Sequence, residues 1–321
     1  MTLRWFTVVG AALAVFFSAS VAANAQASDP KAAEASALSV SEADEPATPA
    51  MWKLSDKDSE IWLLGTFHIL PPDLDWRSKA VAAAIDKADT FWFEAEVDTA
   101  EANQKTVQIL MTEGFNKPGE TLSGLLGPED AERLAAVARD VGLQLAAIDS
   151  MRPWQAFLAL SVRFVVSRGF DPASGVETVL LKEARARKAH LRFFETVEQQ
   201  LGLFTSLPPQ TEKRLLVATL RDWDKQAGEF DALFDAWRSG DVATLDGMMN
   251  DEMREEAPKA FETLVTKRNE AWADEIAKAM AGSGKTLVAV GAGHLVGAHS
   301  VPALLKAKGF KVERCGPESC D

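Results

Sequence analysis

The segment Thr286-Leu-Val-Ala-Val-Gly-Ala-Gly-His294 holds the clearest buried strand of the chain, and it runs directly into a Gly-x-x-His pattern. Far upstream, Ile61-Trp-Leu-Leu-Gly-Thr-Phe-His68 repeats this arrangement, because a short apolar run again ends in Gly-x-x-His. A residue just beyond the carboxyl end of a strand lies where α/β sheets hold their ligands. The repeated pattern therefore predicts that His68 and His294 meet at one edge of a sheet.

The rest of the chain supplies further strands and many helices around this pair. Short apolar runs followed by turn residues predict strands, and apolar residues spaced three and four apart predict helices. We therefore expect a mixed α/β (α+β) fold in which helices cover a small central sheet, with a largely helical middle and one long helix over 257–280. The strands are expected near residues 61–67, 90–97, 190–194, 286–291 and 310–314.

The first fifty residues differ from the rest in composition. One positive charge, an apolar run and small residues near positions 25–27 are typical of a cleaved signal peptide over residues 1–27. Residues 28–50 are rich in Ala, Ser, Pro and acidic residues, which predicts a disordered linker. Residues 51–321 are expected to form a single domain with a helical insertion at about 128–282. The protein is thus predicted to be periplasmic or secreted, with no stable membrane anchor after cleavage.

Composition limits the partners and the chemistry. The 321 residues include 34 Lys and Arg against 47 Asp and Glu, a net charge of −13, so a nucleic-acid partner is not expected. There is no Tyr, which excludes phenolic catalysis, and only four His. Cys315 and Cys320 enclose a turn-forming sequence, and in an oxidising compartment they predict a small disulfide. The sequence leaves the oligomeric state open.

A carboxylate on a third strand could complete a site around the two His. Glu94 and Glu96 both follow the aromatic run Phe91-Trp-Phe93. Two His and one carboxylate suit Mn, Fe, Co or Zn and leave positions open for water and substrate. The alternative interpretation is that each His is simply hydrogen-bonded within the structure. Both interpretations remain open at this level, and so does the choice between Glu94 and Glu96.

Several motifs, in this order along the chain, resemble the TraB/GumN family. They are Trp62-Leu-Leu-Gly-Thr-Phe-His68, Ala88-Asp-Thr-Phe-Trp-Phe-Glu94, Met151-Arg-Pro-Trp154, Phe194-Glu-Thr196 with Gln199, Arg268-Asn269 and Val290-Gly-Ala-Gly-His-Leu-Val-Gly297. That family is similar to the Tiki metalloproteases, in which paired Gly-x-x-His motifs and an acidic residue are proposed to bind a divalent metal. The resemblance covers nearly the whole chain from about residue 50 onward.

The resemblance implies roles for individual residues. His68, His294 and Glu94 would be metal ligands, with Mn or Co favoured and Zn possible, and Glu94 and Arg268 would be catalytic. Arg268 could bind a substrate carboxylate or a tetrahedral oxyanion, or it could pair with an acidic residue of the chain. Supporting positions around these groups would be Glu96, Glu177, Glu195, Gly65 and Gly291.

Two functions of different classes follow from these observations. The first is an exported metal-dependent hydrolase, specifically a peptidase that acts on a peptide or protein substrate. In the second, a periplasmic protein binds and sequesters a peptide or signal in the same place without catalysis. Fold resemblance alone does not decide between them.

Overall fold

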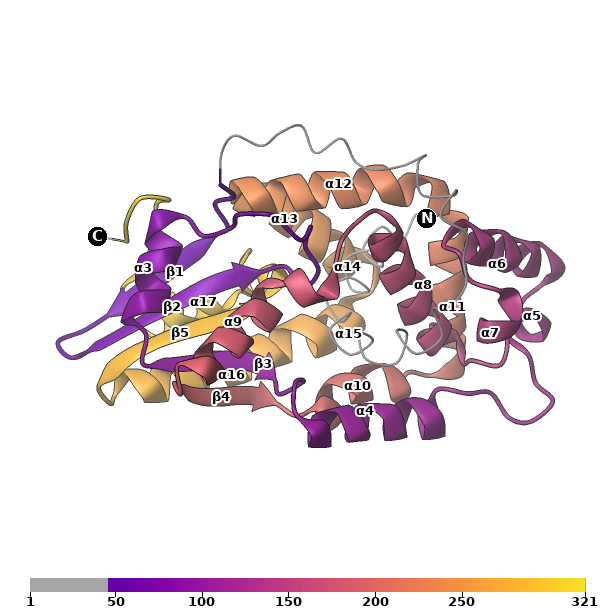
Figure 1. Ribbon diagram of the computed structural model, residues 1–321, viewed down its shortest axis with the longest axis horizontal. Coiled ribbons are helices and arrows are strands. Elements are labelled where there is room, and N and C mark those ends of the chain that lie inside the picture. Colours follow the sequence, from indigo (N-terminus) through magenta and orange to yellow (C-terminus); the bar gives the residue numbers. More distant parts are fainter. Residues whose placement is uncertain (1–45, 321) are drawn as a thin grey trace.

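The computed structural model describes residues 46–320, and the predicted signal peptide lies outside these residues, as does most of the predicted linker. Its centre is a six-stranded sheet in the order β4-β3-β5-β2-β1-β6 (Figure 1). The strands are β1 (Met51–Ser55), β2 (Ser59–Thr66), β3 (Thr90–Ala95), β4 (His190–Glu195), β5 (Gly284–Gly291) and β6 (Val312–Arg314). Helices surround this sheet, so the predicted mixed α/β class is confirmed.

The strand directions bring four strand ends together. β4, β3, β5 and β2 pair in parallel, whereas β1 pairs antiparallel with both β2 and β6. In the β2–β5 pair, Gly65 lies opposite Val290 and Thr66 opposite Gly291. The two Gly-x-x-His patterns therefore leave the sheet side by side. This is the arrangement that their repetition in the sequence predicts.

All five predicted strands are present, and β1 is an additional one. It forms a hairpin with β2 across a turn in which the Asp56 side chain accepts hydrogen bonds from the N–H groups of Asp58 and Ser59. An Asp that binds the backbone two and three residues on is a usual turn former. The turn was recognisable in the sequence, but the strand before it was not, because Met51-Trp-Lys-Leu-Ser is short and interrupted by Lys53.

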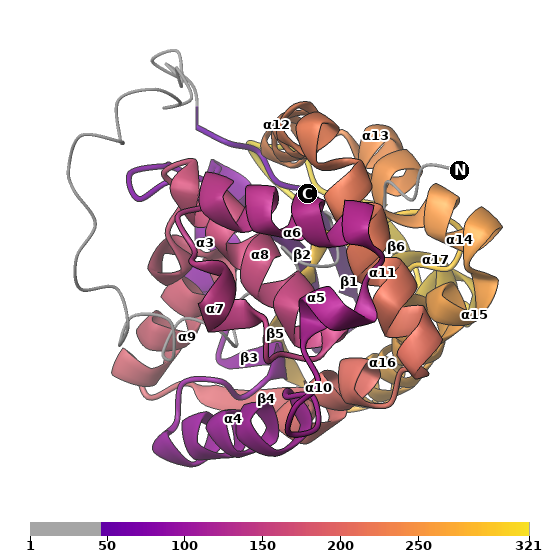
Figure 2. The ribbon, with the colours of Figure 1, turned by 90° about the vertical axis from the view of Figure 1, so that its right-hand side faces the viewer.

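Helices cover the sheet and extend well beyond it. They are α3 (Lys79–Lys87), α4 (Ala100–Glu113), α5 (Leu122–Leu125), α6 (Pro128–Asp140), α7 (Leu145–Ile148), α8 (Pro153–Ser167), α9 (Val176–Ala186), α10 (Val197–Thr205), α11 (Pro209–Arg221), α12 (Trp223–Ser239), α13 (Val242–Asp246), α14 (Glu252–Glu256), α15 (Pro258–Phe261), α16 (Lys267–Met280) and α17 (Val301–Ala307). Figures 1 and 2 show that α5–α8 and α11 gather beyond the carboxyl ends of the parallel strands. The helical part therefore lies beside the predicted site.

The packed part of the chain begins earlier than predicted. Ala47 and Ala50 are buried, the Ala47 N–H donates to the carbonyl of Asp75, and the Thr48 N–H donates to the carbonyl of Arg238. The last residues of the predicted linker, 46–50, thus belong to the folded domain. Small side chains are compatible with a linker, but here they allow an extended segment to lie close against α12.

The predicted long helix over 257–280 is present from Pro258 onward and contains a π-helical turn. Ala257 has φ −137° and ψ 57°, outside the helical region, and it precedes Pro258, which disfavours helical backbone in the residue before it. A π-helical turn over Glu262–Thr266 then joins α15 to α16. Apolar periodicity predicted a single helix but does not reveal the π-helical turn within it. This turn ends at Thr266, two residues before Arg268.

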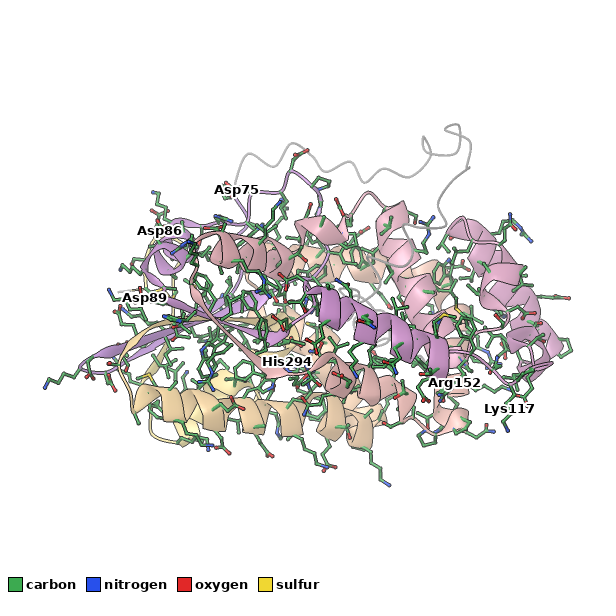
Figure 3. All side chains as sticks on the ribbon, turned by 60° about the horizontal axis from the view of Figure 1, so that its bottom comes forward. Asp75, Asp86, Asp89, Lys117, Arg152 and His294 are labelled. Carbon is green, nitrogen blue, oxygen red and sulfur yellow. A yellow bond between two sulfur atoms is a disulfide. The ribbon has the colours of Figure 1, made fainter. Side chains whose placement is uncertain are left out.

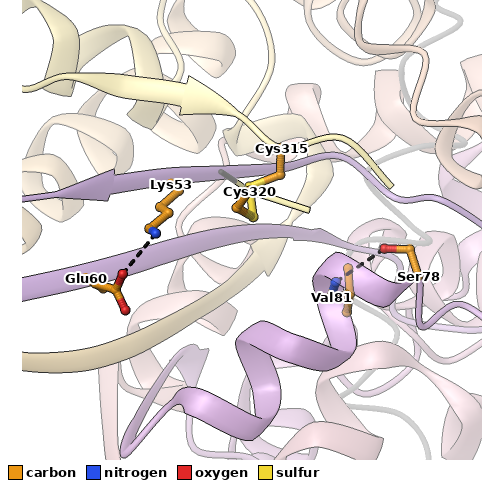
Figure 4. Close-up of a disulfide and its surroundings, with 6 residues drawn as sticks. All are labelled: Lys53, Glu60, Ser78, Val81, Cys315 and Cys320. Atoms are coloured by element: carbon orange, nitrogen blue, oxygen red, sulfur yellow. Dashed lines mark hydrogen bonds and ion pairs between the residues drawn. A yellow bond between two sulfur atoms is a disulfide. The ribbon is translucent and has the colours of Figure 1, made fainter. Parts of the chain in front are cut away.

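A disulfide closes a small loop in the C-terminal segment, directly after β6. Cys315 and Cys320 are joined, as predicted (Figure 4). The Cys315 N–H donates to the carbonyl of Met51 in β1. Among residues 46–320, no helix is long and apolar enough to cross a bilayer. We expect both cysteines of the protein isolated from an oxidising compartment to resist alkylation until a reductant is added, with mass spectrometry as the readout. Two alkylated thiols without reductant would contradict this.

Candidate functional site

The predicted site residues lie at the carboxyl ends of the four parallel strands. His68 follows β2 and His294 follows β5. Glu94 is the second-to-last residue of β3, and Glu195 is the last residue of β4. Figure 3 shows His294 near the middle of the molecule, where the sheet meets the helical part. In open parallel sheets this end binds ligands, so the fold places the residues where chemistry is expected.

Gly291 is the point around which three of these side chains gather. A Cβ placed on Gly291 would lie 3.2 Å from Glu94 Oε1, 3.4 Å from His68 Nε2 and 3.8 Å from His294 Cδ2. The missing side chain keeps this space free, which explains the glycine of the second Gly-x-x-His pattern. Gly65, the matching glycine of the first pattern, allows close backbone approach instead: its Cβ would lie 3.3 Å from the Ala50 carbonyl oxygen.

Arg268, in the first turn of α16, donates hydrogen bonds to three other side chains of the site. Its Nε and Nη2 donate to the two oxygens of Glu195 at 2.6 and 2.9 Å, and Nη2 also donates to Glu94 Oε2 at 2.8 Å. Its Nη1 donates to the carbonyl of Leu264 at 3.1 Å and to His294 Nε2 at 3.0 Å. A guanidinium has five N–H donors, and all five are used here. An oxyanion could contact Arg268 only by displacing one of these partners.

His294 is held neutral in one tautomer. Because Nε2 accepts from Arg268, the proton must lie on Nδ1, which donates to Asn269 Oδ1 at 2.6 Å. Asn269 is fully buried, and its Nδ2 donates to the carbonyl of His299, which fixes the amide orientation. Burial and the neighbouring Arg268 charge lower the pKa of His294 to about 3. The imidazole is therefore uncharged over the physiological range.

Glu94 is a buried carboxylate that stays ionised. Its Oε1 accepts from the Gly291 N–H at 2.8 Å, and its Oε2 accepts from Arg268 and from Gln200 Nε2 at 3.1 Å. Burial alone would raise the pKa of Glu94, but the Arg268 charge and the Gly291 hydrogen bond contribute to lowering it to about 2. Gln200, which is buried on α10, carried no signal in the sequence that could have marked it as a site residue.

His68 is oriented by a different carboxylate. Its Nδ1 lies 2.8 Å from Oε1 of Glu177, which stands on α9 and also accepts the hydroxyl of Thr66. Burial lowers the pKa of His68, but the Glu177 and Glu94 charges outweigh this, and the net pKa is raised above its ordinary value. Within residues 46–320, His68 Nε2 makes no hydrogen bond, and it is the ring nitrogen that lies toward Gly291.

Glu96 lies away from these groups. β3 ends at Ala95, so Glu96 no longer follows the strand, and its carboxylate pairs with Arg185 Nη2 at 2.7 Å. Asp98 binds the same guanidinium, and all three side chains are partly exposed, by 33–41%. A strand over 90–97, as predicted, would place Glu94 and Glu96 on the same face of the sheet, because alternate residues of a strand share a face. β3 ends at Ala95 instead, and this separates the two carboxylates. The structure therefore brings together His68, Glu94, Glu177, Glu195, Arg268 and His294 and leaves Glu96 outside.

The side chains as they lie do not fit a divalent metal. Among residues 46–320, no group of three or more His, Cys, Asp or Glu side chains is arranged to hold a metal ion. In addition, a neutral imidazole has a single ring lone pair, and that of His294 accepts from Arg268. The metal implied by the resemblance stays a prediction.

Gly175 is a site residue that the sequence reasoning missed. It precedes α9, and a Cβ at this position would lie 1.9 Å from the backbone carbonyl oxygen of His68. Only glycine allows α9, and with it Glu177, to approach the His68 backbone so closely. A glycine at a helix start was the only signal in the sequence.

We expect Gly175→Ala to destabilise the protein by about 1–3 kcal/mol or more, because either the His68 loop or α9 must move to make room. Urea unfolding measures this. Gly228→Ala is the matched control, since Gly228 lies in α12 with nothing within 4 Å of its added Cβ, and alanine favours helix. Equal stability of the two variants would contradict the close approach at Gly175.

The fold and the site define an α/β protein with a charged cluster at the carboxyl ends of parallel strands. The model of the TraB/PrgY/gumN family matches residues 50–314, and the chain belongs to this family. The uncharacterized protein YbaP of Escherichia coli is 24% identical over 245 residues, which cover 76% of this chain and 87% of YbaP. An uncharacterized protein of Treponema pallidum is 21% identical over 269 residues, 80% of each chain. No solved structure matches.

Proposed function

We propose that the protein is a hydrolase that cleaves peptide bonds, with His68 as its general acid and base. The observation that supports this most directly is the state of the two imidazoles. Both ring nitrogens of His294 are engaged, whereas His68 presents Nε2 toward Gly291 while Glu177 lies at its Nδ1. A histidine that acts as a base through one ring nitrogen, while a carboxylate orients the other ring nitrogen, is a recurring catalytic arrangement.

The reaction can be written with these residues alone. His68 Nε2 accepts a proton from a water molecule as the water oxygen attacks the carbonyl carbon of the peptide. The protonated His68, stabilised by Glu177, then gives this proton to the leaving nitrogen, and the C–N bond breaks to yield a carboxylic acid and an amine. Arg268 contributes its positive charge to the site, while its donors hold Glu94, Glu195 and His294 in place.

Export forms the second part of the proposal. The disulfide between Cys315 and Cys320 fits an extracytoplasmic location, because such bonds persist in oxidising compartments. We propose that residues 1–27 are removed as a signal peptide and that the mature protein acts in the periplasm or outside the cell. Intact-mass measurement of exported protein should place the N-terminus at Gln26 or Ser28, and retention of Met1 would contradict this.

A binding protein without catalysis is the second candidate, and one observation favours it. The polar groups of Arg268 and His294 are already satisfied within the protein, so most of the cluster is complete without a substrate. In this case the protein would hold a peptide at the strand ends and release it unchanged. Turnover distinguishes the two candidates, because a binding protein protects a peptide and a hydrolase cuts it.

The experiment is a digest of an unbiased peptide library by the full exported protein, with products identified by mass spectrometry. We expect cleavage by the wild type and a loss of kcat/KM by about 10²–10⁴-fold in His68→Ala, because the acid and base are removed. His190→Ala is the matched control, since His190 is exposed at the start of β4, and it should keep full activity. Cleavage by His68→Ala at the wild-type rate would exclude His68 from the reaction.

The dependence on pH provides a second readout. A base must be unprotonated, and the pKa of His68 is raised above its ordinary value by Glu177 and Glu94. We therefore expect kcat/KM to increase with pH, with a midpoint above 6.5, the ordinary pKa of a histidine. Weakening the Glu177 contact by Glu177→Gln should move this midpoint to lower pH. A midpoint that Glu177→Gln leaves unchanged would contradict the orientation of His68 by Glu177.

A further inference from the structure

We infer that Arg268 is the resident cation of this site, and that a divalent ion can bind His294 and Glu94 only where the guanidinium has left them. This inference holds whether the site catalyses hydrolysis or only binds a ligand. It concerns the chain's own residues, and it explains why side chains of suitable type do not form a metal-binding group. Its evidence is the hydrogen bonding and the charge around Arg268.

The hydrogen bonding decides which lone pairs are available. His294 Nε2 accepts from Arg268 at 3.0 Å, and its Nδ1 proton is committed to Asn269 at 2.6 Å. The opposite tautomer would break the Asn269 contact, because the Asn269 amide is fixed by the His299 carbonyl. A metal at His294 Nε2 would thus have to take the place of Arg268 Nη1. Glu94 Oε2 is bound by the same guanidinium at 2.8 Å.

The charges lead to the same conclusion. The side chains of Arg268, Glu94 and Glu195 are only 11–12% exposed, so their interactions are weakly screened by solvent. In wild-type protein one guanidinium donates to both carboxylates and offsets one of their two negative charges. A divalent ion beside them would meet the positive charge of Arg268 at close range and would be repelled.

Removal of Arg268 would reverse both conditions. Glu94 and Glu195 would keep their negative charges without a partner, and His294 Nε2 would regain its lone pair. His68 Nε2 lies at the same point beside Gly291. Two imidazoles with carboxylates suit Mn, Co and Zn. The same side chains that bind Arg268 in the wild type would therefore form a metal site in its absence.

The test is titration of metal-free protein with Co²⁺ as the sole probe. Calorimetry gives the affinity, and the visible absorption of bound Co²⁺ reports its ligands. We expect Arg268→Ala to bind about one Co²⁺ at least about tenfold more tightly than wild type, a difference of about 1.4 kcal/mol. Arg185→Ala is the matched control, since Arg185 also joins two carboxylates but on the surface, and it should bind as the wild type does.

Two results would overturn the inference. One is a folded Arg268→Ala variant that binds Co²⁺ no more tightly than wild type. The other needs no variant of Arg268 and so remains decisive if Arg268→Ala fails to fold: wild-type protein that binds one Co²⁺ equivalent in a complex lost on His294→Asn, with Arg268 still bound to Glu94 and Glu195 in the crystal structure of that complex. Wild-type protein without such a His294-dependent complex supports the inference. Neither result bears on whether wild-type protein cleaves peptides, which the library digest measures separately.

Discussion

Replacement of Arg268 with Leu is expected to lower the free energy of unfolding by about 3–5 kcal/mol, the usual cost of leaving buried charges without their partner. The guanidinium holds Glu94 and Glu195, and among residues 46–320 it is the Lys or Arg group with which each of these carboxylates forms an ion pair. Leu fills much of the volume of Arg, so lost charge contributes more to the change than lost packing does. Urea denaturation at pH 7 measures the loss.

The matched control is Arg185→Leu. Arg185 also joins two carboxylates, those of Glu96 and Asp98, but its side chain is 38% exposed. Ion pairs at the surface contribute only about 0–1 kcal/mol, so this variant should be nearly as stable as wild type. Both variants replace an Arg that has two acidic partners. Comparing them therefore separates the effect of burial from the effect of ion pairing. If the two variants lost equal free energy of unfolding, burial of the Arg268 ion pairs would not be the cause of the loss.

The effect of Arg268→Leu should also depend on pH. Glu94 has a pKa of about 2 in the folded protein, against 4.5 for an ordinary glutamate. Its contribution to stability is therefore present above pH 4.5 and is lost as the pH falls toward 2. Without the guanidinium, burial raises the pKa of Glu94, and protonation then relieves the unpaired charge in mild acid. We therefore expect the difference between variant and wild type to be largest near pH 7 and to narrow below pH 4.5. A constant difference would contradict this.

The sequence predicted much of the fold because the buried strands carry their own signal. The run Leu287–Val290 is wholly apolar and lies at the centre of the sheet, where both faces are covered. The meeting of His68 and His294 followed from the same logic, since parallel strands place their carboxyl ends at one edge. What could be predicted is thus what depends on local composition and on strand direction.

The details of the site were not predictable because they depend on which side chains meet across long separations. Gln200 and Glu94 are 106 positions apart, and nothing in either segment indicates their contact. The use of all five donors of Arg268 depends on the turn before α16, which apolar periodicity did not reveal. Glu94 and Glu96 could not be separated because no Pro or Gly marks the end of β3 at Ala95.

The separation of these two carboxylates leads to the largest expected effect on activity. We expect Glu94→Gln to abolish turnover, a loss of at least about 10³-fold, and to lower stability by about 1–3 kcal/mol. Three donors face the Glu94 carboxylate, namely the Gly291 N–H, Arg268 Nη2 and Gln200 Nε2. A glutamine offers one oxygen and one NH₂ group, so in either orientation a donor faces a donor. Gly291 and Arg268 must then shift, and His68 and His294 lose their shared geometry.

Glu96→Gln is the matched control, because it makes the same chemical change two residues away, where the carboxylate binds only the exposed Arg185. It should keep wild-type stability within about 1 kcal/mol and wild-type activity. Peptide cleavage and urea unfolding of the two variants, measured in parallel, test the assignment. If Glu94→Gln matched Glu96→Gln in both measurements, Glu94 would have no part in the reaction. The hydrogen bonds to Gly291 and Arg268 would then be structural, and His68 would have to act without them.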